Sequence, residues 1–92
     1  MNDEKYFEKK LRIEVEKKGG YAIKFSSFSF TGMPDRLVLL PEGRIWFVEL
    51  KSPGKKPSPR QKTVIALLIK LGFKVRIIDS NETLQNFLKE IE

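Results

Sequence analysis

An aspartate, a glutamate and a lysine of this chain are of the types that hold a metal ion and cleave phosphate esters. Asp35 directly precedes one apolar segment, and Glu49 and Lys51 lie at the end of the next. Two adjacent carboxylates repel each other, and one keeps its proton unless a cation lies between them. A divalent metal ion would resolve this conflict and provide a Lewis acid for a phosphoryl oxygen. Lys51 could orient the attacking water or neutralise charge in the transition state, and the Leu50 carbonyl could add an oxygen ligand. The alternative is a surface ion pair between Glu49 and Lys51, with Asp35 capping a turn.

The apolar segments 36–40 and 44–50 predict a β-hairpin that brings these residues together. A proline and a glycine in the three residues between the segments favour a tight turn. If the turn is centred on residue 42, positions 35 and 49 pair, because each lies seven residues from that centre. Paired Cβ atoms are about 4.5–5.5 Å apart, and residues two apart share a strand face. The second segment is apolar on both faces, which indicates a central strand covered on both sides.

Helices and strands are predicted on either side of this hairpin. Apolar residues at helical spacing over 3–18 predict a first helix that ends at Gly19-Gly20. Ser58-Pro59-Arg60-Gln61 places Ser, Pro and Gln at the N-cap, N1 and N3 positions, which predicts a capping box and a helix that ends at Gly72. The order αβββαβα predicts one α/β domain over residues 1–92. The other expected elements are a strand over 21–25, a loop over 26–31, a strand over 73–78 and a last helix after Asp79-Ser80.

Composition narrows the possible chemistry. The chain has 92 residues, 40% hydrophobic and 33% charged, a balance typical of a globular protein. It contains neither cysteine nor histidine, which excludes disulfides, most zinc sites and any mechanism with a histidine base. Any metal ion must therefore be a hard cation bound by carboxylates, carbonyls and water. No apolar run approaches the roughly 20 residues of a membrane span, and the lysine-rich start lacks a signal-peptide core.

A net charge of +6 favours an anionic partner, most often nucleic acid. Basic residues gather over positions 51–62, a stretch without acidic residues. Such side chains contact phosphates and give position, not sequence information. Phe28 and Phe30 could stack on an exposed base, although such residues more often pack their loop onto the core or a partner subunit. The predicted phosphate contacts are Lys55, Lys56, Arg60 and Lys62, with Lys24 and Arg36 as weaker candidates.

Three motifs give the chain a resemblance to a nuclease family. Gly32-Met33-Pro34-Asp35, followed after thirteen residues by Glu49-Leu50-Lys51, resembles the PD…(D/E)xK signature. Ser58-Pro59-Arg60-Gln61 resembles the S-P-x-Q element of the VRR-NUC branch of that superfamily. The first helix, its double glycine and the element order also fit, so the resemblance covers essentially the whole chain. It implies a mixed central sheet flanked by helices, and hydrolysis of DNA that depends on Mg²⁺ or Mn²⁺.

The resemblance also implies a role for each residue of the site. Asp35 and Glu49 would be metal ligands and Lys51 the catalytic lysine. Gln61 would face the metal site from the start of its helix, and it could do so while capping that helix.

A glutamate of the first helix would complete the site, because families of this kind place one there. Glu8 lies eleven residues before Gly19, which is similar to the spacing in archaeal Holliday-junction resolvases. Glu4, one turn earlier, fits other VRR-NUC sequences. Glu8 is the preferred candidate for catalysis and metal binding, and Glu4 is the alternative.

The expected reaction is hydrolysis of a DNA phosphodiester, and the resemblance implies that it leaves a 5′ phosphate. A chain this short can contact few bases, so we expect it to recognise shape, such as a four-way junction. Cutting two strands symmetrically calls for two active sites, which a homodimer would provide. The loop with Phe28 and Phe30, and a patch formed by Tyr6 and Ile13, are possible contact surfaces between the two subunits. No small-molecule cofactor is expected, and the compact chain suggests a cytoplasmic protein of phage or bacterial origin.

Two other classes of function are compatible with the sequence. One is a catalytically silent DNA-binding module, which would not require Asp35, Glu49 and Lys51. The other is a small protein-interaction factor whose lysines only give solubility. The second alternative predicts no salt-dependent affinity for DNA, whereas phosphate contacts predict a steep loss of affinity as salt rises.

Overall fold

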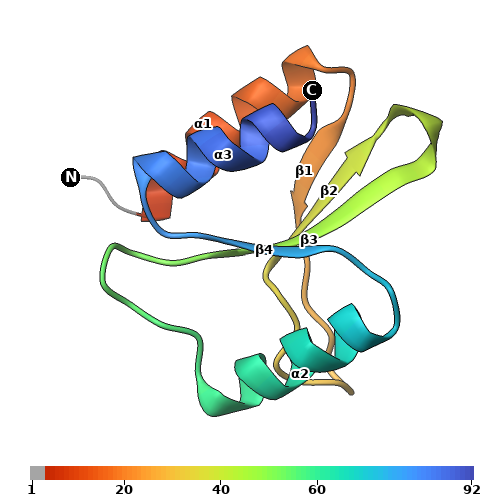
Figure 1. Cartoon of the computed structure of the whole chain (residues 1–92), viewed down its shortest axis with the longest axis vertical. Coiled ribbons are helices and arrows are strands. Elements are labelled where there is room, and N and C mark those ends of the chain that lie inside the picture. The colour runs from red at the N-terminus through yellow and green to blue at the C-terminus, as the bar shows by residue number, and fades with distance from the viewer. Residues whose placement is uncertain (1–3) are drawn as a thin grey trace.

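The computed structural model describes residues 4–92, and its elements follow the predicted order αβββαβα (Figure 1). The first helix was expected from residue 3, but residues 1–3 lie outside the described residues. Within residues 4–92, no helix is both long enough and apolar enough to cross a membrane. The elements are α1 (Glu4–Lys17), β1 (Tyr21–Lys24), β2 (Arg36–Leu40), the 3-10 turn η1 (Pro41–Gly43), β3 (Arg44–Leu50), α2 (Pro59–Lys70), β4 (Val75–Ile78) and α3 (Asn81–Glu90).

The strands form one mixed sheet in the order β1-β2-β3-β4. β1 pairs antiparallel with β2 and β2 with β3, whereas β3 and β4 are parallel. Helices α1 and α3 cover one face, and α2 lies on the other (Figure 1). β3 contributes Trp46, Val48 and Leu50 to the core beside α1 and α3, and Phe47 to the core beside α2. The prediction that this segment is a central strand covered on both faces is confirmed.

The β2–β3 hairpin has the register predicted from its sequence. Arg36 pairs with Val48, and the pairing continues one residue at a time along both strands to Leu40 and Arg44, next to η1. The same register extended by one residue places Asp35 opposite Glu49. The predicted meeting of these two positions is therefore confirmed.

Apolar helix faces hold the three helices against the sheet. The apolar stripes of α1 and α3 are buried. The apolar face of α2 is covered less completely, because Val64 and Leu68 are buried whereas Leu71, just past its end, is 65% exposed. The last strand begins at Val75, two residues later than predicted. The buried stripe residues are Phe7, Leu11 and Val15 of α1 and Leu84, Phe87 and Leu88 of α3, followed by Ile91.

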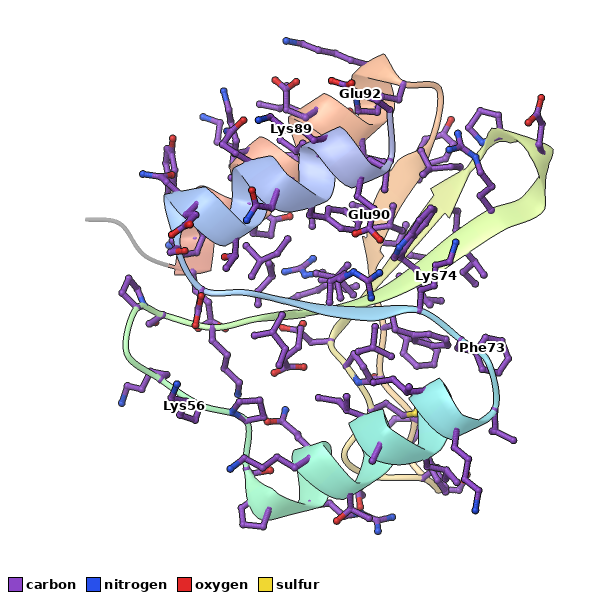
Figure 2. The ribbon with its side chains drawn as sticks, viewed as in Figure 1. Lys56, Phe73, Lys74, Lys89, Glu90 and Glu92 are labelled. Atoms are coloured by element: carbon purple, nitrogen blue, oxygen red, sulfur yellow. The ribbon has the colours of Figure 1, made fainter. Side chains whose placement is uncertain are left out.

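A salt bridge adds a polar contact between α3 and the sheet. Glu90 faces the sheet, whereas Lys89 beside it points outward (Figure 2). Arg76 of β4 donates hydrogen bonds to Glu90, and this contact lowers the pKa of the Glu90 carboxyl. Both side chains are partly exposed, so solvent screening limits the contribution of the pair to stability.

The chain between α1 and β1 requires glycine for two different reasons. Gly19 has φ 86°, a left-handed conformation common just past the end of a helix. Gly20 is constrained by space: a Cβ atom there would lie 2.1 Å from the carbonyl oxygen of Leu39. The second glycine therefore lets the connection pass close to the backbone of β2.

Gly20→Ala should destabilise the fold by about 1–3 kcal/mol, because the added methyl group would push against backbone and not against a movable side chain. Gly54→Ala is the matched control, since Gly54 has a positive φ of 83° but open space around its Cβ position. It should lose only about 1 kcal/mol from backbone strain. Urea unfolding measures both. An equal loss in the two variants would contradict the proposed close approach.

Candidate active site

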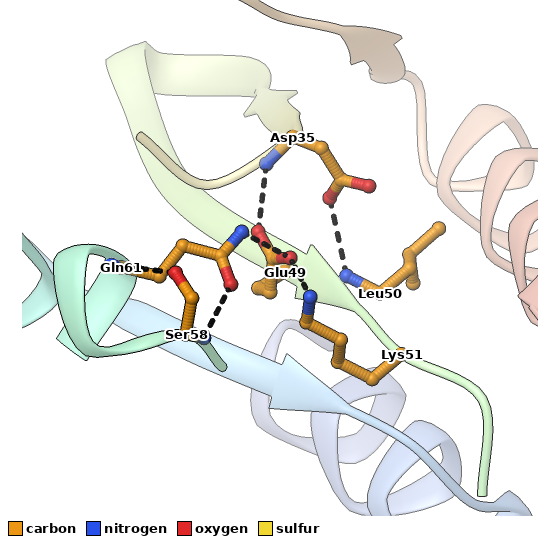
Figure 3. A network of polar contacts seen from close by, with 6 residues as sticks. All are labelled: Asp35, Glu49, Leu50, Lys51, Ser58 and Gln61. Carbon is orange, nitrogen blue, oxygen red and sulfur yellow. Dashed lines mark hydrogen bonds and ion pairs between the residues drawn. The ribbon is translucent and has the colours of Figure 1, made fainter. Parts of the chain in front are cut away.

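Asp35 and Glu49 hold each other through reciprocal hydrogen bonds at the end of the β2–β3 ladder. The backbone N–H of Asp35 donates to Glu49 Oε1 at 3.1 Å. The N–H of Leu50, next to Glu49, donates to Asp35 Oδ1 at 3.1 Å. Figure 3 shows Asp35 just before β2 and Glu49 on β3, with the dashed lines of the two hydrogen bonds between these segments. The hairpin therefore brings both carboxylates together and gives each of them one backbone donor.

Pro34 removes one backbone donor at the point where this ladder ends. The register places Pro34 opposite Leu50, and the N–H of Lys51 bonds to β4, so the polar groups of Leu50 face β2. Proline has no N–H to donate. The Leu50 carbonyl therefore receives no ladder hydrogen bond from Pro34, while the Leu50 N–H uses the Asp35 carboxylate. The Leu50 oxygen stays a predicted metal ligand.

Glu49 is a buried carboxylate, only 2% exposed. Besides the Asp35 N–H, it accepts a hydrogen bond from Gln61 Nε2 at 2.9 Å and pairs with Lys51 Nζ at 3.1 Å. Burial raises the pKa of the Glu49 carboxyl, and the nearby charge of Asp35 raises it further. Lys51 and the Asp35 N–H oppose this rise in pKa without cancelling it. A cation near both carboxylates would favour the ionised form.

Gln61 combines the two roles considered for it. Ser58 Oγ accepts from the Gln61 N–H at 3.1 Å, and Gln61 Oε1 accepts from the Ser58 N–H at 3.0 Å, so the predicted capping box is confirmed. Because the amide oxygen is used by the cap, the amide nitrogen is left to donate to Glu49 (Figure 3). The start of α2 thus sets the orientation of the Glu49 carboxylate.

A cleft of about 350 Å³ opens on the α1 side of Asp35. Both candidate glutamates, Glu4 and Glu8, line it. The Glu8 carboxylate lies 3.5 Å from Arg12 Nε and 3.5 Å from Arg36 Nη1, so two arginines hold it. The cleft residues are Glu4, Lys5, Glu8, Lys24, Asp35, Arg36 and Leu50.

The acidic residues approach Asp35 from two faces of the sheet. Glu8 belongs to α1, whereas Glu49 points toward α2. Over residues 4–92, no three acidic side chains are gathered closely enough to form a metal-binding group. The adjacent pair Asp35 and Glu49, with the Leu50 carbonyl, nevertheless offers the oxygen donors that a hard divalent cation prefers. The raised pKa of Glu49 is a further reason why this pair fits a cation.

The predicted phosphate contacts divide into exposed and internally bonded side chains. Lys24, Lys55, Lys56 and Lys62 are exposed. Arg60 is exposed too, but it donates from Nε to the Thr31 carbonyl at 3.2 Å, and its guanidinium lies 5.5 Å from the centre of the Phe30 ring. The Arg36 side chain is only 13% exposed and is paired with Glu8.

Sequence reasoning missed the arginines that hold Glu8. Arg12 lies four residues after Glu8 on the same helix face, a spacing that could have indicated the contact. Arg36 had no comparable signal, because its contact with Glu8 depends on how α1 packs across the sheet. Of the two loop phenylalanines, Phe30 lies under Arg60, and Phe28 is fully exposed.

Asp35→Asn should stabilise the metal-free protein at neutral pH. The pKa of Glu49 is raised in the fold, so its ionised form lowers the free energy of unfolding above that pKa, and this cost disappears as pH falls through it. An asparagine still accepts from the Leu50 N–H but no longer repels Glu49. We expect a gain on the order of 1 kcal/mol at pH 7, or about 4–8 °C in Tm.

Thermal melts in EDTA from neutral to acid pH test this, with the exposed Glu16→Gln of α1 as a control for the change in net charge. The gain of Asp35→Asn should shrink as pH falls through the pKa of Glu49. A gain of the same size in Glu16→Gln, or one independent of pH, would count against repulsion between the two carboxylates.

Comparison with known proteins assigns the chain to a family. The family model described as the VRR-NUC domain matches residues 2–82. A protein of Acyrthosiphon pisum secondary endosymbiont phage 1, named "Putative nuclease p44", is 52% identical over 75 residues, covering 82% of this chain and 81% of that protein. A solved structure described as a VRR_NUC domain superposes with a TM-score of 0.89 at 31% identity over 100% of both chains. The chain therefore belongs to the VRR-NUC family of the PD-(D/E)xK nuclease superfamily.

Proposed function

We propose that this chain is a metal-dependent endonuclease that hydrolyses phosphodiester bonds in branched DNA. The observation that carries the proposal is the Asp35–Glu49 pair at the end of the β2–β3 ladder, in which the buried Glu49 carboxylate also contacts Lys51 and Gln61. A structural salt bridge between Glu49 and Lys51 would not require a second carboxylate beside it. The family membership and the name of the phage relative support the same class of reaction.

Mg²⁺, with Mn²⁺ able to replace it, is the proposed cofactor. Asp35, Glu49 and the Leu50 carbonyl would hold it, and Glu8 or Glu4 would approach from the α1 side of the cleft. When bound, the ion would neutralise the paired carboxylates and act as a Lewis acid toward a phosphoryl oxygen. The absence of histidine and cysteine is consistent with an oxygen-only donor set.

Lys51 and Gln61 have separate roles in the proposed reaction. The Lys51 ammonium, 3.1 Å from Glu49, would either position the attacking water or neutralise the charge that develops on the phosphoryl group. Gln61 is a positioning residue, because it keeps one oxygen of Glu49 in place through a side chain that is itself fixed by the helix cap. The 3′ oxygen is the proposed leaving group, so the product carries a 5′ phosphate.

The proposed substrate is a four-way junction bound by a homodimer. The exposed lysines of the 51–58 loop and the start of α2 would contact phosphates, which positions DNA without reading its sequence. A small domain with few base contacts can still select a branched substrate through its shape. Two subunits related by a two-fold axis would place one site on each of the two strands to be cut.

Cleavage of a labelled four-way junction should require Mg²⁺ and should fall at least about 10²-fold in Lys51→Ala, because the charge opposite the reacting phosphate is lost. Lys89→Ala is the matched control, since Lys89 points outward from α3 (Figure 2). Gel assays with junction, duplex and single strands, in Mg²⁺ and in EDTA, measure the rates. Tight binding without cleavage of any substrate in Mg²⁺ or Mn²⁺ would instead indicate a silent DNA-binding module. Absence of any salt-dependent affinity for DNA would indicate a protein-interaction factor.

Gln61→Glu should slow cleavage by about 10–100-fold, as loss of a supporting contact around a metal ligand does. Its carboxylate can still accept from the Ser58 N–H, but it places a negative charge against Glu49. Ser58→Ala provides the complementary case. It should lose about 1 kcal/mol of stability through the cap and cleave close to the wild-type rate. Wild-type cleavage by Gln61→Glu would show that this contact does not position Glu49.

A further inference from the structure

The face of the sheet that carries α2 is built from three rows of side chains. Residues that pair directly across strands point to the same face, so the register defines each row. One row contains Asp35 and Glu49 of the site, and the next contains Phe47 and Val75, which pack against α2. The third row lies toward the hairpin turn. This outer row consists of Tyr21, Leu39 and Ile45, which pair in register, and Phe73, which continues the β3–β4 register two residues before Val75.

The outer row is apolar and uncovered. Its exposed fractions are 63% for Tyr21, 37% for Leu39, 37% for Ile45 and 43% for Phe73. The Phe73 ring contacts Phe47 edge-on, with ring centres 5.6 Å apart, which places it on the same face. Figure 2 shows Phe73 just past the C-terminal end of α2. The row therefore extends beyond the part of the sheet that α2 covers.

Leu71, just past the end of α2, extends this apolar surface. It lies seven residues after Val64 and three after Leu68, so it continues the helix face that packs on the sheet. Val64 and Leu68 are buried, whereas Leu71 is 65% exposed. Together with the outer row it leaves on the order of 500 Å² exposed, as large as the largest apolar patch of a typical monomer.

We propose that the outer row and Leu71 form the surface on which a second copy of this chain docks. A stable interface needs about 800 Å² from each partner, with an apolar centre and a polar rim. The patch provides the centre of such an interface. A two-fold axis brings each residue near its own copy or its neighbours, and a row without charged residues meets itself without like-charge repulsion.

Other features of the surface fit this occupant less well. DNA binding requires cations, and those of positions 51–62 lie with the site and not in the outer row. The Tyr6/Ile13 patch shares its surface with Lys9 and Lys10, so self-association there would bring lysines toward lysines. The exposed Phe28 is a single side chain at a loop tip and offers little area.

Docking through the outer row keeps both active sites free. Asp35 and Glu49 each lie four residues along their strands from the outer row, which is about 13 Å. Each subunit of the dimer would carry its site at the far end of the same sheet face. This inference names the partner surface of the proposed junction-cutting dimer and rests on that proposal, but the interface can be measured without cleavage.

The experiment compares the solution masses of four proteins by light scattering during size-exclusion chromatography. Ile45→Lys and Tyr21→Lys place a charge in the outer row. Tyr21→Lys disturbs folding less, because Tyr21 is the more exposed of the two and lies on an edge strand. Ile13→Lys is the matched control, because Ile13 is 36% exposed against 37% for Ile45. The wild type and Ile13→Lys should run at twice the 10.7 kDa chain mass, and both outer-row variants at the single chain mass. Circular dichroism melts check that each variant is folded.

A wild-type monomer would overturn the proposal, as would dissociation by Ile13→Lys with both folded outer-row variants still dimeric. The same samples, given a junction in Mg²⁺, should show paired incisions for the wild type and single nicks for the outer-row variants. A wild-type dimer that cuts nothing would contradict the proposed nuclease function but not the proposed interface. A wild-type monomer that cuts would contradict the interface but not the nuclease function.

Discussion

The antiparallel register between β2 and β3 determines where every side chain of the site lies. Because side chains alternate between the two faces of a strand, a slip of one residue would turn Glu49 and Lys51 into the core beside α1 and α3. The short turn and the apolar residues on both faces of β3 prevent such a slip. At the end of this ladder Pro34 offers no N–H to β3. The Leu50 N–H bonds to the Asp35 carboxylate, and the Asp35 N–H bonds to Glu49.

Holding Glu49 ionised in the core is the electrostatic difficulty that the surrounding residues address. Burial and Asp35 both raise its pKa, and the local donors offset this only in part. A buried charge is tolerated when its hydrogen bonds are satisfied and an opposite charge lies close by. Glu49 receives donors from β2, from α2 and from Lys51 on its own strand segment. The site is thus the point at which otherwise separate parts of the fold are joined by polar contacts.

Much of this arrangement follows from local sequence patterns. The hairpin register came from equal spacing around residue 42, and the helix cap came from Ser58 and Gln61, because both signals act over a few residues. The contact between Arg36 and Glu8 could not be foreseen, since it depends on the packing of α1 across the sheet. The exposure of Ile45 and Leu71 was also hidden, because periodicity shows which face is apolar but not how far a covering helix extends. The choice between Glu4 and Glu8 stays open for the same reason, since both reach one cleft.

The shared use of Gln61 links catalysis to the least stable part of a helix. Helix ends fray more readily than helix centres, because their first N–H groups lack partners within the helix. Here the same side chain closes the cap and holds Glu49. Each opening of the first turn of α2 therefore also removes the Gln61 contact from the Glu49 carboxylate, and the two events share one equilibrium. The backbone N–H of Gln61, which donates to Ser58 Oγ, would consequently exchange with solvent at a rate that reports how often this contact to the site is broken.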